Sequence, residues 1–527
     1  MKRFSRGVLV VVLCAAFSAA GGPPLRAQEP PPPETPASGT PTLLEYQANA
    51  QTLSLKDVMQ SALEKNLNIA VQRLDPKIAE TNIDTEESVF SPLMDFRARE
   101  SENTQPGSSQ LSGGASVTDS NRLIEATFTQ AYKIGSNFRF DVFTNRTHTN
   151  NSFATVNPSY FSQALATYTQ HFLRGFGLEV NKTGIIIAQN NEQISRSRFR
   201  QIVMDTLSTT EKSYWALAFT IMDQQAKEAS LKLAQDFLDQ TRIKVKVGTL
   251  PPIEITQAEA QVADQEEGII VGFAAIRRAE DNLRALMNIP SDSPVWHQPI
   301  QLADNPEVLD KIVNEDEAVK TALANRPDLE QARLDLASQD ANVHFQKNQK
   351  LYRLDLIGQY GAAGLSGDFL PAGPELSIGN SYTQIRDRDF PTWSVELQLG
   401  VPLTNKAAEA AYARSRYQQD QSRLNIDQLE QSVLVEVRNA VRQIESDLKR
   451  IKAAQVNTRL QLEKLSAEQK KYENGMSTAF QVLTFQTDLT SARRRENLAI
   501  VDYNTDLVEL DRVLGILLDT RNVTIAN

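Results

Sequence analysis

The 527-residue chain is poor in the residues that enzymes and metalloproteins use for chemistry. It has one cysteine and four histidines, and no histidine has a second histidine or a carboxylate at zinc-site spacing. The four are His148, His171, His297 and His344. No HExxH, CxxC, nucleophile elbow or phosphate-binding loop is present. We therefore expect a protein that is not an enzyme, with no catalytic residue, no metal site and no cofactor.

Positive charge is also scarce. The chain has 55 Lys and Arg against 65 Asp and Glu, for a net charge of −10. Residues 1–27 hold four of the positive charges and no acid, so their removal would take the net charge to −14. Binding to nucleic-acid phosphates needs clustered Lys and Arg. Nucleic acid is therefore excluded as a partner.

The chain begins with a pattern typical of a secretory signal peptide. A positively charged start precedes the apolar run Val8–Phe17, which is too short to span a bilayer. We predict that residues 1–27 are a signal peptide, cleaved there or after Ala20. Lipid attachment at Cys14 is disfavoured, because Leu13 stands where a small residue is required. Without Cys14 the mature chain can form no disulfide.

Beyond the signal peptide the chain has no long hydrophobic run. The longest is Gly268–Ile276, about half of a membrane span. If this exported chain enters a membrane, it must do so as a closed β-barrel, since only barrels and apolar helices satisfy the backbone in lipid. Residues 28–50 are rich in proline and are interpreted as an extended linker.

An internal duplication organises the rest of the chain. Val58–Ile69 resembles Ala318–Leu329 at an offset of 260 residues. The same interval of 41 residues separates Gly248 from Ile289 and Gly475 from Ile516. We predict a first structural repeat over 51–290, a linker over 291–313, a second repeat over 314–517 and a C-terminal tail over 518–527.

Two segments predict unusually long helices. Ile185–Val247 has no glycine or proline in 63 residues, and Leu403–Asn474 has none in 72. Both are rich in good helix formers. About 65 helical residues extend roughly 100 Å. The second segment also has a coiled-coil seam at Val437, Val441, Ile444, Leu448 and Ile451. Each repeat thus reads as helix, strands, very long helix, turn and helix.

Strands are expected between the helices. Trp393–Val401 alternates apolar and polar residues, which is typical of a membrane barrel strand and also of a half-buried strand in a soluble protein. Weaker candidates are Asp95–Glu100, Tyr160–Phe172 and Leu354–Tyr360. The segments Pro106–Ser120 and Ala362–Asp389 are predicted to be exposed loops.

These residues resemble the TolC-like outer-membrane efflux proteins, also called outer membrane factors. The resemblance rests on LSLKDVMQSALEKNLNI at Leu53–Ile69, on its partner at Ala318–Leu329 and on Pro402-Leu403 before the second long helix. Two phrases between helices fit the same pattern, Val247–Leu250 and Tyr472–Gly475. The order of these phrases, together with the duplication, carries the resemblance.

The resemblance covers roughly residues 51 to 517 and implies a mostly helical fold. Long antiparallel helical hairpins would form an α-barrel tunnel, and membrane strands would be shared in a trimeric β-barrel. It implies a homotrimer in the outer membrane of a Gram-negative cell, with its helices in the periplasm. The trimer would be the exit duct of a tripartite efflux or type I secretion system, with a periplasmic adaptor protein and an inner-membrane transporter as partners.

One part of the sequence departs from the family pattern of four strands per chain and twelve per trimer. Leu123–Tyr132 and Asn137–Thr147, joined at Ile134-Gly135-Ser136, predict an additional β-hairpin. This hairpin would either enlarge the barrel or lie beside it.

The resemblance also implies that the two helix-hairpin turns dock the adaptor. The expected docking residues are Val247, Gly248, Thr249, Leu250, Asn474, Gly475, Met476, Ser477 and Thr478. Glycine suits a chain reversal with positive φ, and Pro251-Pro252 can start the returning helix. The alternative is that both turns are only structural.

A gate at the periplasmic end is implied as well. Tyr472 and Glu254 stand where the family holds its hairpins together, and we predict a hydroxyl-to-carboxylate hydrogen bond between them. Alternatively, Glu254 is only a favourable first-turn acid and Tyr472 a packing residue. Gln481 and Thr484 replace the family's constricting carboxylates, and Ser477 replaces a basic residue. The closed constriction should therefore be less cation-selective and its latch weaker.

A second function remains open on the sequence alone. A periplasmic coiled-coil scaffold or adaptor that never enters the membrane would also have a signal peptide and long helices, with its strands in a soluble sandwich. An outward apolar face over Trp393–Val401 distinguishes the channel from the scaffold.

Overall fold

The computed structural model describes residues 42–107, 114–310, 313–370 and 377–524. The predicted signal peptide (1–27), Cys14 and most of the predicted linker (28–50) lie outside the described residues. Within the described ranges, no helix has both the length and the hydrophobicity of a membrane span.

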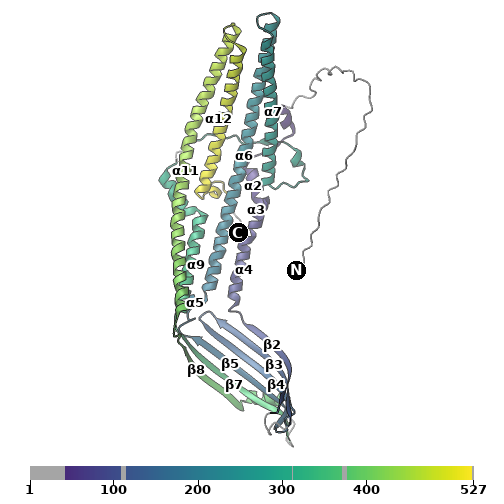
Figure 1. The fold of residues 1–527 in the computed structure, drawn as a ribbon, viewed down its shortest axis with the longest axis vertical. Coiled ribbons are helices and arrows are strands. Elements are labelled where there is room, and N and C mark those ends of the chain that lie inside the picture. Colours follow the sequence, from purple (N-terminus) through teal and green to yellow (C-terminus); the bar gives the residue numbers. More distant parts are fainter. Residues whose placement is uncertain (1–41, 108–113, 311–312, 371–376, 525–527) are drawn as a thin grey trace, which may run out of the picture. The chain divides into compact units, whose positions relative to one another are not determined.

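Two long antiparallel helical hairpins dominate the fold (Figure 1). In the first, α6 (Thr183–Lys246, 64 residues) returns through α7 (Ile253–Leu286). In the second, α11 (Lys406–Glu473, 68 residues) returns through α12 (Ala479–Val513). Both predicted long helices are confirmed. The predicted seam packs as expected, with Val437, Val441, Ile444 and Ile451 buried.

Shorter helices pack beside the long ones, and two of them complete a layer of four helices. In the predicted first repeat they are α2 (Leu55–Lys65), α3 (Leu67–Gln72) and α4 (Leu74–Ser88), and in the predicted second α8 (Glu315–Asn325) and α9 (Pro327–Gln349). Side chains of Ser54 and Asp57 form a capping box that starts α2. Helix contacts give the order α4, α6, α9, α11, so α4 and α11 are the edges of the layer.

Six strands of the described residues form one fully antiparallel sheet. They are β2 (Leu93–Pro106), β3 (Ser116–Tyr132), β4 (Ser136–Thr149), β5 (Val156–His171), β7 (Arg353–Phe369) and β8 (Phe390–Gly400). Their spatial order follows the chain, so β2 and β8 are the edges. Every predicted strand overlaps one of these six, although Tyr160–Phe172 and Trp393–Val401 each run one residue past the end of the observed strand.

The predicted extra hairpin is β3–β4, and it lies inside the sheet rather than beside it. β3 pairs with β2, and β4 pairs with β5, through continuous registers. The chain therefore has six strands in this sheet, where the family resemblance implied four. Strand β3 also starts at Ser116, so the predicted loop Pro106–Ser120 was drawn too long; residues 108–113 lie outside the described part.

The two faces of the sheet differ in chemistry. One face carries mostly apolar or small residues in its cross-strand rows; a row made of them alone is Phe96, Ala126, Val142, Ala164, Ala362 and Pro391. We call this the apolar face. On β8 it carries Trp393, Val395, Leu397 and Leu399, which are 61–73% exposed. The opposite face, called the polar face, carries residues such as Arg97, Glu125, Asp141, Gln359 and Glu396.

The predicted loop Ala362–Asp389 is wrong in two respects. β7 continues to Phe369, and a helix, α10 (Ile378–Asp387), precedes β8. Gly364 and Gly367, inside the predicted loop, lie in the strand, where small residues allow close neighbours. Residues 371–376 are outside the described part.

Short elements pack on the helices, most of them in or at the borders of the segments predicted as linkers and tail, and one, α5, inside the predicted first repeat. These are α1 (Leu43–Tyr46), η1 (Gln47–Asn49), β1 (Gln51–Leu53), α5 (Leu178–Asn181), η3 (Pro294–His297), β6 (Ile300–Leu302) and α13 (Leu517–Thr520). β1 and β6 pair in parallel, which joins the start of the first repeat to residues after it. Leu43, Ile300 and Leu518 are buried in the same hydrophobic cluster.

Candidate functional site

The two turns at the free ends of the hairpins have the same backbone geometry. Gly248 has a φ of 80° and Gly475 a φ of 74°. The Gly248 N–H donates to the Val245 carbonyl at 3.0 Å, and the Gly475 N–H donates to the Tyr472 carbonyl at 3.2 Å. The next residue in each turn donates to the carbonyl one position earlier. This is the helix-ending pattern in which glycine adopts the left-handed conformation, as the sequence predicted.

Several of the predicted docking residues are engaged within their own turns. The Thr249 hydroxyl donates to the Lys244 carbonyl at 2.8 Å, and the Asn474 amide donates to the Lys470 carbonyl at 2.7 Å. The Ser477 hydroxyl donates to Glu468 at 2.6 Å, and this bond, aided by Lys471, lowers the pKa of the Glu468 carboxyl. Thr478 caps α12. These polar side chains shape the turns.

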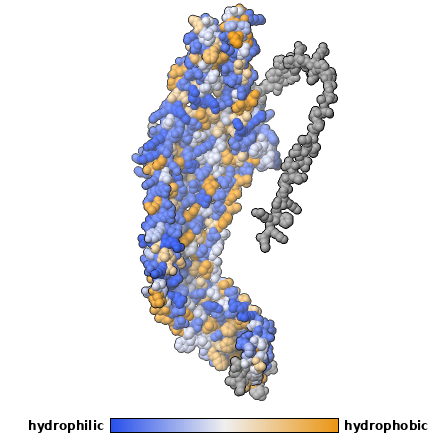
Figure 2. All heavy atoms as spheres, in the orientation of Figure 1, coloured by the Kyte–Doolittle hydropathy of each residue, from blue (hydrophilic) through white to orange (hydrophobic). Residues whose placement is uncertain are grey.

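What the turns leave open to solvent is apolar. Val247 and Met476, both predicted docking residues, are 67% and 71% exposed. Three further residues were missed by sequence reasoning although they lie within a helical turn of the predicted phrases: Ile243, Ile253 and Phe480. We call these five residues the hairpin-end patch. Figure 2 shows hydrophobic side chains at the free end of the first hairpin.

Around both glycines of the turns there is open space. A Cβ added at Gly248 or Gly475 would meet no atom within 4 Å. The turns therefore do not need glycine for packing inside the chain; they need it only for positive φ. The absence of a side chain at these glycines also lets the backbone of another protein approach the turns closely.

Tyr472 joins the two hairpins just before the second turn. Its ring is buried against Phe237 of α6, with ring centroids 5.1 Å apart. The Thr241 hydroxyl donates to the Phe237 carbonyl, which leaves it to accept from the Tyr472 hydroxyl at 3.3 Å. The Lys244 ammonium lies 4.1 Å from the centre of the same ring and donates to the Tyr472 carbonyl at 2.9 Å. We call Thr241, Lys244 and Tyr472 the inter-hairpin latch.

The predicted hydrogen bond between Tyr472 and Glu254 does not form. Glu254, at the start of α7, lies near Tyr472: burial and then the charge of Glu254 raise the pKa of the Tyr472 phenol. One oxygen of its carboxylate is buried, with no hydrogen-bond partner among the described residues. Thr241 takes the tyrosine hydroxyl instead because it lies one turn from Phe237, against which the Tyr472 ring packs. The sequence offered no sign of this, since Thr241 is one of several hydroxyl residues on α6.

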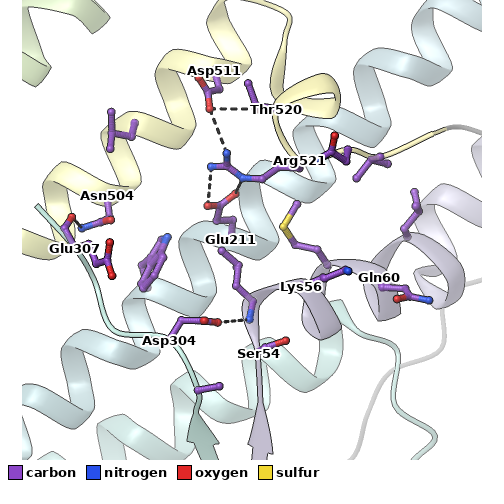
Figure 3. Close-up of a pocket in the computed structure, with 18 of the residues that line it drawn as sticks. Ser54, Lys56, Gln60, Glu211, Asp304, Glu307, Asn504, Asp511, Thr520 and Arg521 are labelled. Atoms are coloured by element: carbon purple, nitrogen blue, oxygen red, sulfur yellow. Dashed lines mark hydrogen bonds and ion pairs between the residues drawn. The ribbon is translucent and has the colours of Figure 1, made fainter. Parts of the chain in front are cut away.

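A separate cavity of about 1150 Å³ lies between α2, α6, α12 and the C-terminal segment (Figure 3). Arg521 crosses it and donates to both oxygens of Glu211, at 2.9 and 3.0 Å, and approaches Asp511 at 3.4 Å. Trp215 and Met59 supply apolar walls. The ion pairs fasten the C-terminal segment, which the sequence treated as a tail, to the first repeat.

No group of three His, Cys, Asp or Glu residues in the described ranges is arranged to hold a metal ion. His171 is paired with Asp355 at 2.7 Å, from β5 to β7. The structure brings the predicted docking and gate residues together at the hairpin ends and adds Thr241 and Lys244 to them.

Comparison with known proteins agrees with this architecture. Residues 318–516 match the family described as outer membrane efflux protein. The predicted family resemblance is confirmed. The match runs from within α8 to just past the end of α12. No curated protein matches the sequence significantly.

Solved structures of outer-membrane channels share the fold along most of the chain. The channel OprN aligns with a TM-score of 0.63 at 15% identity, covering 88% of this chain and 89% of its own. The Campylobacter jejuni channel CmeC gives 0.62 at 14% identity, with 88% and 86% covered. The open state of the Neisseria gonorrhoeae channel MtrE gives 0.58 at 17% identity, with 88% and 89% covered. The chain thus has the fold of the outer-membrane efflux channels, mostly helical with a β-sheet part.

Proposed function

We propose that the protein is a homotrimeric outer-membrane duct without catalytic activity, the exit channel of a tripartite efflux or type I secretion system. The observation that carries this is the sheet: one face is apolar and exposed, the other is polar, and both edges lack a partner among the described strands. A lipid-facing apolar surface and a water-facing polar lumen are the two faces of a membrane barrel.

The two edge strands of the sheet have directions that allow them to pair with each other between copies. In an antiparallel sheet of six strands, β2 and β8 run in opposite directions. β8 of one copy can therefore pair antiparallel with β2 of the next, and copies arranged in a ring leave no edge. Three copies would supply eighteen strands.

The helical edges support the same arrangement. Exposed apolar residues follow one stripe along α3 and α4: Leu67, Val71, Leu74 and Ile78. On the other edge, α11 exposes Tyr417 and Leu424. A soluble chain rarely leaves such a stripe uncovered. A neighbouring copy that pairs β8 with β2 would also bring α11 against α4.

The six-stranded sheet and the layer of four helices in one chain have similar widths. Six strands about 4.8 Å apart and tilted by about 40° occupy about 38 Å of circumference. Four helices about 8–10 Å apart occupy about 32–40 Å. A trimer would thus continue from barrel to tunnel without a step, with a backbone diameter of about 36 Å at the sheet.

At the other end, we propose that the hairpin-end patch docks a periplasmic adaptor and that the inter-hairpin latch holds the tunnel closed. Exposed Val247 and Met476 offer apolar contacts, and the open space around Gly248 and Gly475 admits a partner backbone. Transport energy would come from the inner-membrane transporter, since the duct itself has only a passive path.

Fractionation and native mass measurement test the proposal together. Extraction only by detergent, heat-modifiable migration and a mass of three chains are the expected results. Release by osmotic shock, or a stable monomer in detergent, would favour the periplasmic scaffold instead. The exposed apolar face of the sheet counts against that alternative, because a soluble sandwich would cover it.

A further inference from the structure

Helix α10 lies on the apolar face of the sheet, the side that faces lipid in the proposed function. It packs against β5 and β7. The Ser381 hydroxyl of α10 and the Ser162 hydroxyl of β5 are 2.8 Å apart. Ser162 and its cross-strand neighbour Thr144 share the face that carries Trp393 and Val395. The helix between β7 and β8 therefore folds back over the outer surface of the wall.

Specific hydrogen bonds hold α10 on the sheet; we call its contact site on β4, β5 and β7 the seat. A chain of hydroxyl contacts runs from Tyr382 to Thr144 at 2.7 Å, on to Ser162 at 2.7 Å and then to Ser381. Ser162 and Ser381 are fully buried. The Gln384 side chain also accepts from the backbone N–H of Leu365 at 2.8 Å.

Gly364 of β7 makes the close approach possible. A Cβ at this position would overlap the Ser381 backbone carbonyl. By contrast, Gly358 lies on the same strand and the same face, and a Cβ there would be 4.0 Å from its nearest neighbour, the Tyr168 carbonyl. Only the first of these glycines is required by α10.

The seat lies where the apolar face ends. The row of paired residues next to Gly364 on one side is entirely apolar, from Phe96 to Pro391. On the other side, the row contains Glu100 and Arg122, which form an ion pair at 2.8 Å, and Arg146. Gly364 is ten residues from Leu354 at the start of the face. Ten steps along a strand tilted by about 40° rise about 25 Å, the height of a barrel's apolar band.

The exposed side of α10 suits the boundary between lipid and water. Ile378 and Tyr382 lie one turn apart and are 41% and 43% exposed. Arg386 and Asp387 form an exposed ion pair at its C-terminal end. Tyrosine beside aliphatic residues, with charges close by, is the composition that collects at lipid headgroups.

We propose that α10 is a membrane-interface helix: it seals the hydroxyl-lined top of the lipid-facing surface and rests in the headgroup layer of the outer leaflet. Without it, the Leu365 N–H would lose its partner on α10, and Thr144 and Ser162 would keep only their contact with each other, at a cost that lipid imposes on unsatisfied polar groups. This inference rests on the proposed function and adds to it the depth at which the barrel sits.

Spin labels in the assembled protein test the proposal. Single cysteines would replace Ile378 in α10, Val395 on the apolar face and Phe480 at a hairpin end, in a Cys14→Ser background. The protein would be reconstituted in phosphatidylcholine vesicles, and label depth would be read from accessibility to oxygen and to a water-soluble nickel chelate. The Val395→Cys label should be deep in the bilayer, the Phe480→Cys label in water and the Ile378→Cys label within about 5–10 Å of the headgroup boundary.

The outcomes separate the two proposals. If the label at 395 is in water, the membrane channel itself is refuted. If the label at 395 is deep but that at 378 is as water-exposed as the one at 480, the channel stands and the interface helix is refuted. Gly364→Ala should raise the nickel accessibility and mobility of the label at 378, whereas the matched Gly358→Ala should leave both unchanged; equal behaviour of the two variants would contradict the seat.

Discussion

The two predicted repeats of the chain agree closely at their turns and differ at their strands. Gly248 and Gly475 end α6 and α11 with the same hydrogen bonds, 41 residues before Ile289 and Ile516. The hydrogen bonds at these two isoleucines match as well. The Ile289 N–H donates to the Arg284 carbonyl, and the Ile516 N–H donates to the Asp511 carbonyl, five residues back in each case. The returning arms of the two hairpins, from turn glycine to terminal isoleucine, thus have the same length.

The sheet shows no such equality. The first repeat contributes β2, β3, β4 and β5, whereas the second contributes β7 and β8 with α10 between them. Adding a hairpin adds two strands, so the antiparallel alternation and the opposite directions of the edges are preserved. Under the proposed function, hairpin length is constrained because both free ends would meet the same adaptor. Strand number is constrained only to be even, which is why the repeats can diverge there.

The largest effect is expected from charge on the apolar face. Phe140→Arg in the extra hairpin and Val395→Arg in β8 should both abolish assembled trimers in the outer membrane, because arginine at mid-membrane costs about 2–4 kcal/mol per copy. Heat-modifiable trimer in the membrane fraction is the measurement. Thr129→Arg and Ser394→Arg on the polar face are the matched controls and should assemble. Normal assembly of Phe140→Arg would mean that the extra hairpin does not face lipid.

The turns should respond equally in the two repeats. Val247→Asp and Met476→Asp should each weaken drug or dye efflux by about tenfold or more, since replacing an apolar side chain at the centre of an interface costs about 1.4 kcal/mol or more of binding free energy. Gly248→Val and Gly475→Val should have a similar effect, as a branched side chain fills the space around the turn. Trimer content should be unchanged in all four.

Thr249→Val is the control for these substitutions, because it removes a turn hydrogen bond without adding charge to the patch. Retained efflux in both aspartate variants would leave the turns with only a structural role. Loss of efflux in one repeat alone would show that the two ends dock different surfaces.

The inter-hairpin latch should have a moderate effect on closure. Tyr472→Phe removes the bond to Thr241, a contribution of about 0.5–1.5 kcal/mol, and should raise resting conductance in planar bilayers. Lys244→Met should raise it further, because it removes both the bond to the Tyr472 carbonyl and the contact with its ring. Glu254→Gln should have less effect than either, since no hydrogen bond joins it to Tyr472. A larger rise in Glu254→Gln than in Tyr472→Phe would restore the predicted pairing.

The smallest effect concerns an acidic cluster found in one repeat only. Burial, then the carboxylates of Asp506 and Asp502, raise the pKa of Asp447 to about 7 against the opposing charge of Arg450. In the first hairpin, the residue at the same distance from the turn glycine as Asp447 is Thr220. The residues that correspond in the same way to Asp502 and Asp506 are Ala275 and Ala279. The cluster is therefore a feature of the second repeat.

The sign of the pH effect follows from the raised pKa. The folded chain holds this proton more tightly than the unfolded chain, so stability is lost as pH rises from about 4 to about 7. Asp447→Asn cannot titrate. It should melt about 2 °C above the parent at pH 8, with the difference shrinking at pH 5. Thr220→Asn serves as the control and should show no pH-dependent difference. A difference that grows at low pH would contradict the assignment.

Sequence reasoning captured the features that repeat over many residues. The long helices were visible because sixty or more residues without glycine or proline admit little else, and the strand at Trp393–Val401 because its alternation is strict. The fold class and the turn glycines followed. Of the inter-hairpin latch, the sequence predicted Tyr472 but not its partners Thr241 and Lys244, because these depend on how α6 packs against α11.

Features set by long-range packing were missed. Gly364 and Gly367 lie inside the segment predicted as a loop, and only the strands beside them and α10 above them show why they are glycine. The placement of the extra hairpin inside the sheet also depends on pairing with β2 and β5, which local pattern does not specify. Ile243, Ile253 and Phe480 look like core residues by spacing; they are exposed because the hairpins end there.

The central claim is that neighbouring copies close the wall by pairing β8 with β2. Disulfide trapping tests it directly in a Cys14→Ser background, with Val395→Cys combined in turn with Met94→Cys, Phe96→Cys and Ala98→Cys. Within one chain these positions are five strands apart, about 24 Å, so only a second copy can bridge them. At least one pair should give dimers and trimers, and nothing larger, on non-reducing gels of outer membranes. Monomers in all three pairs, or a ladder that continues beyond three chains, would contradict the account.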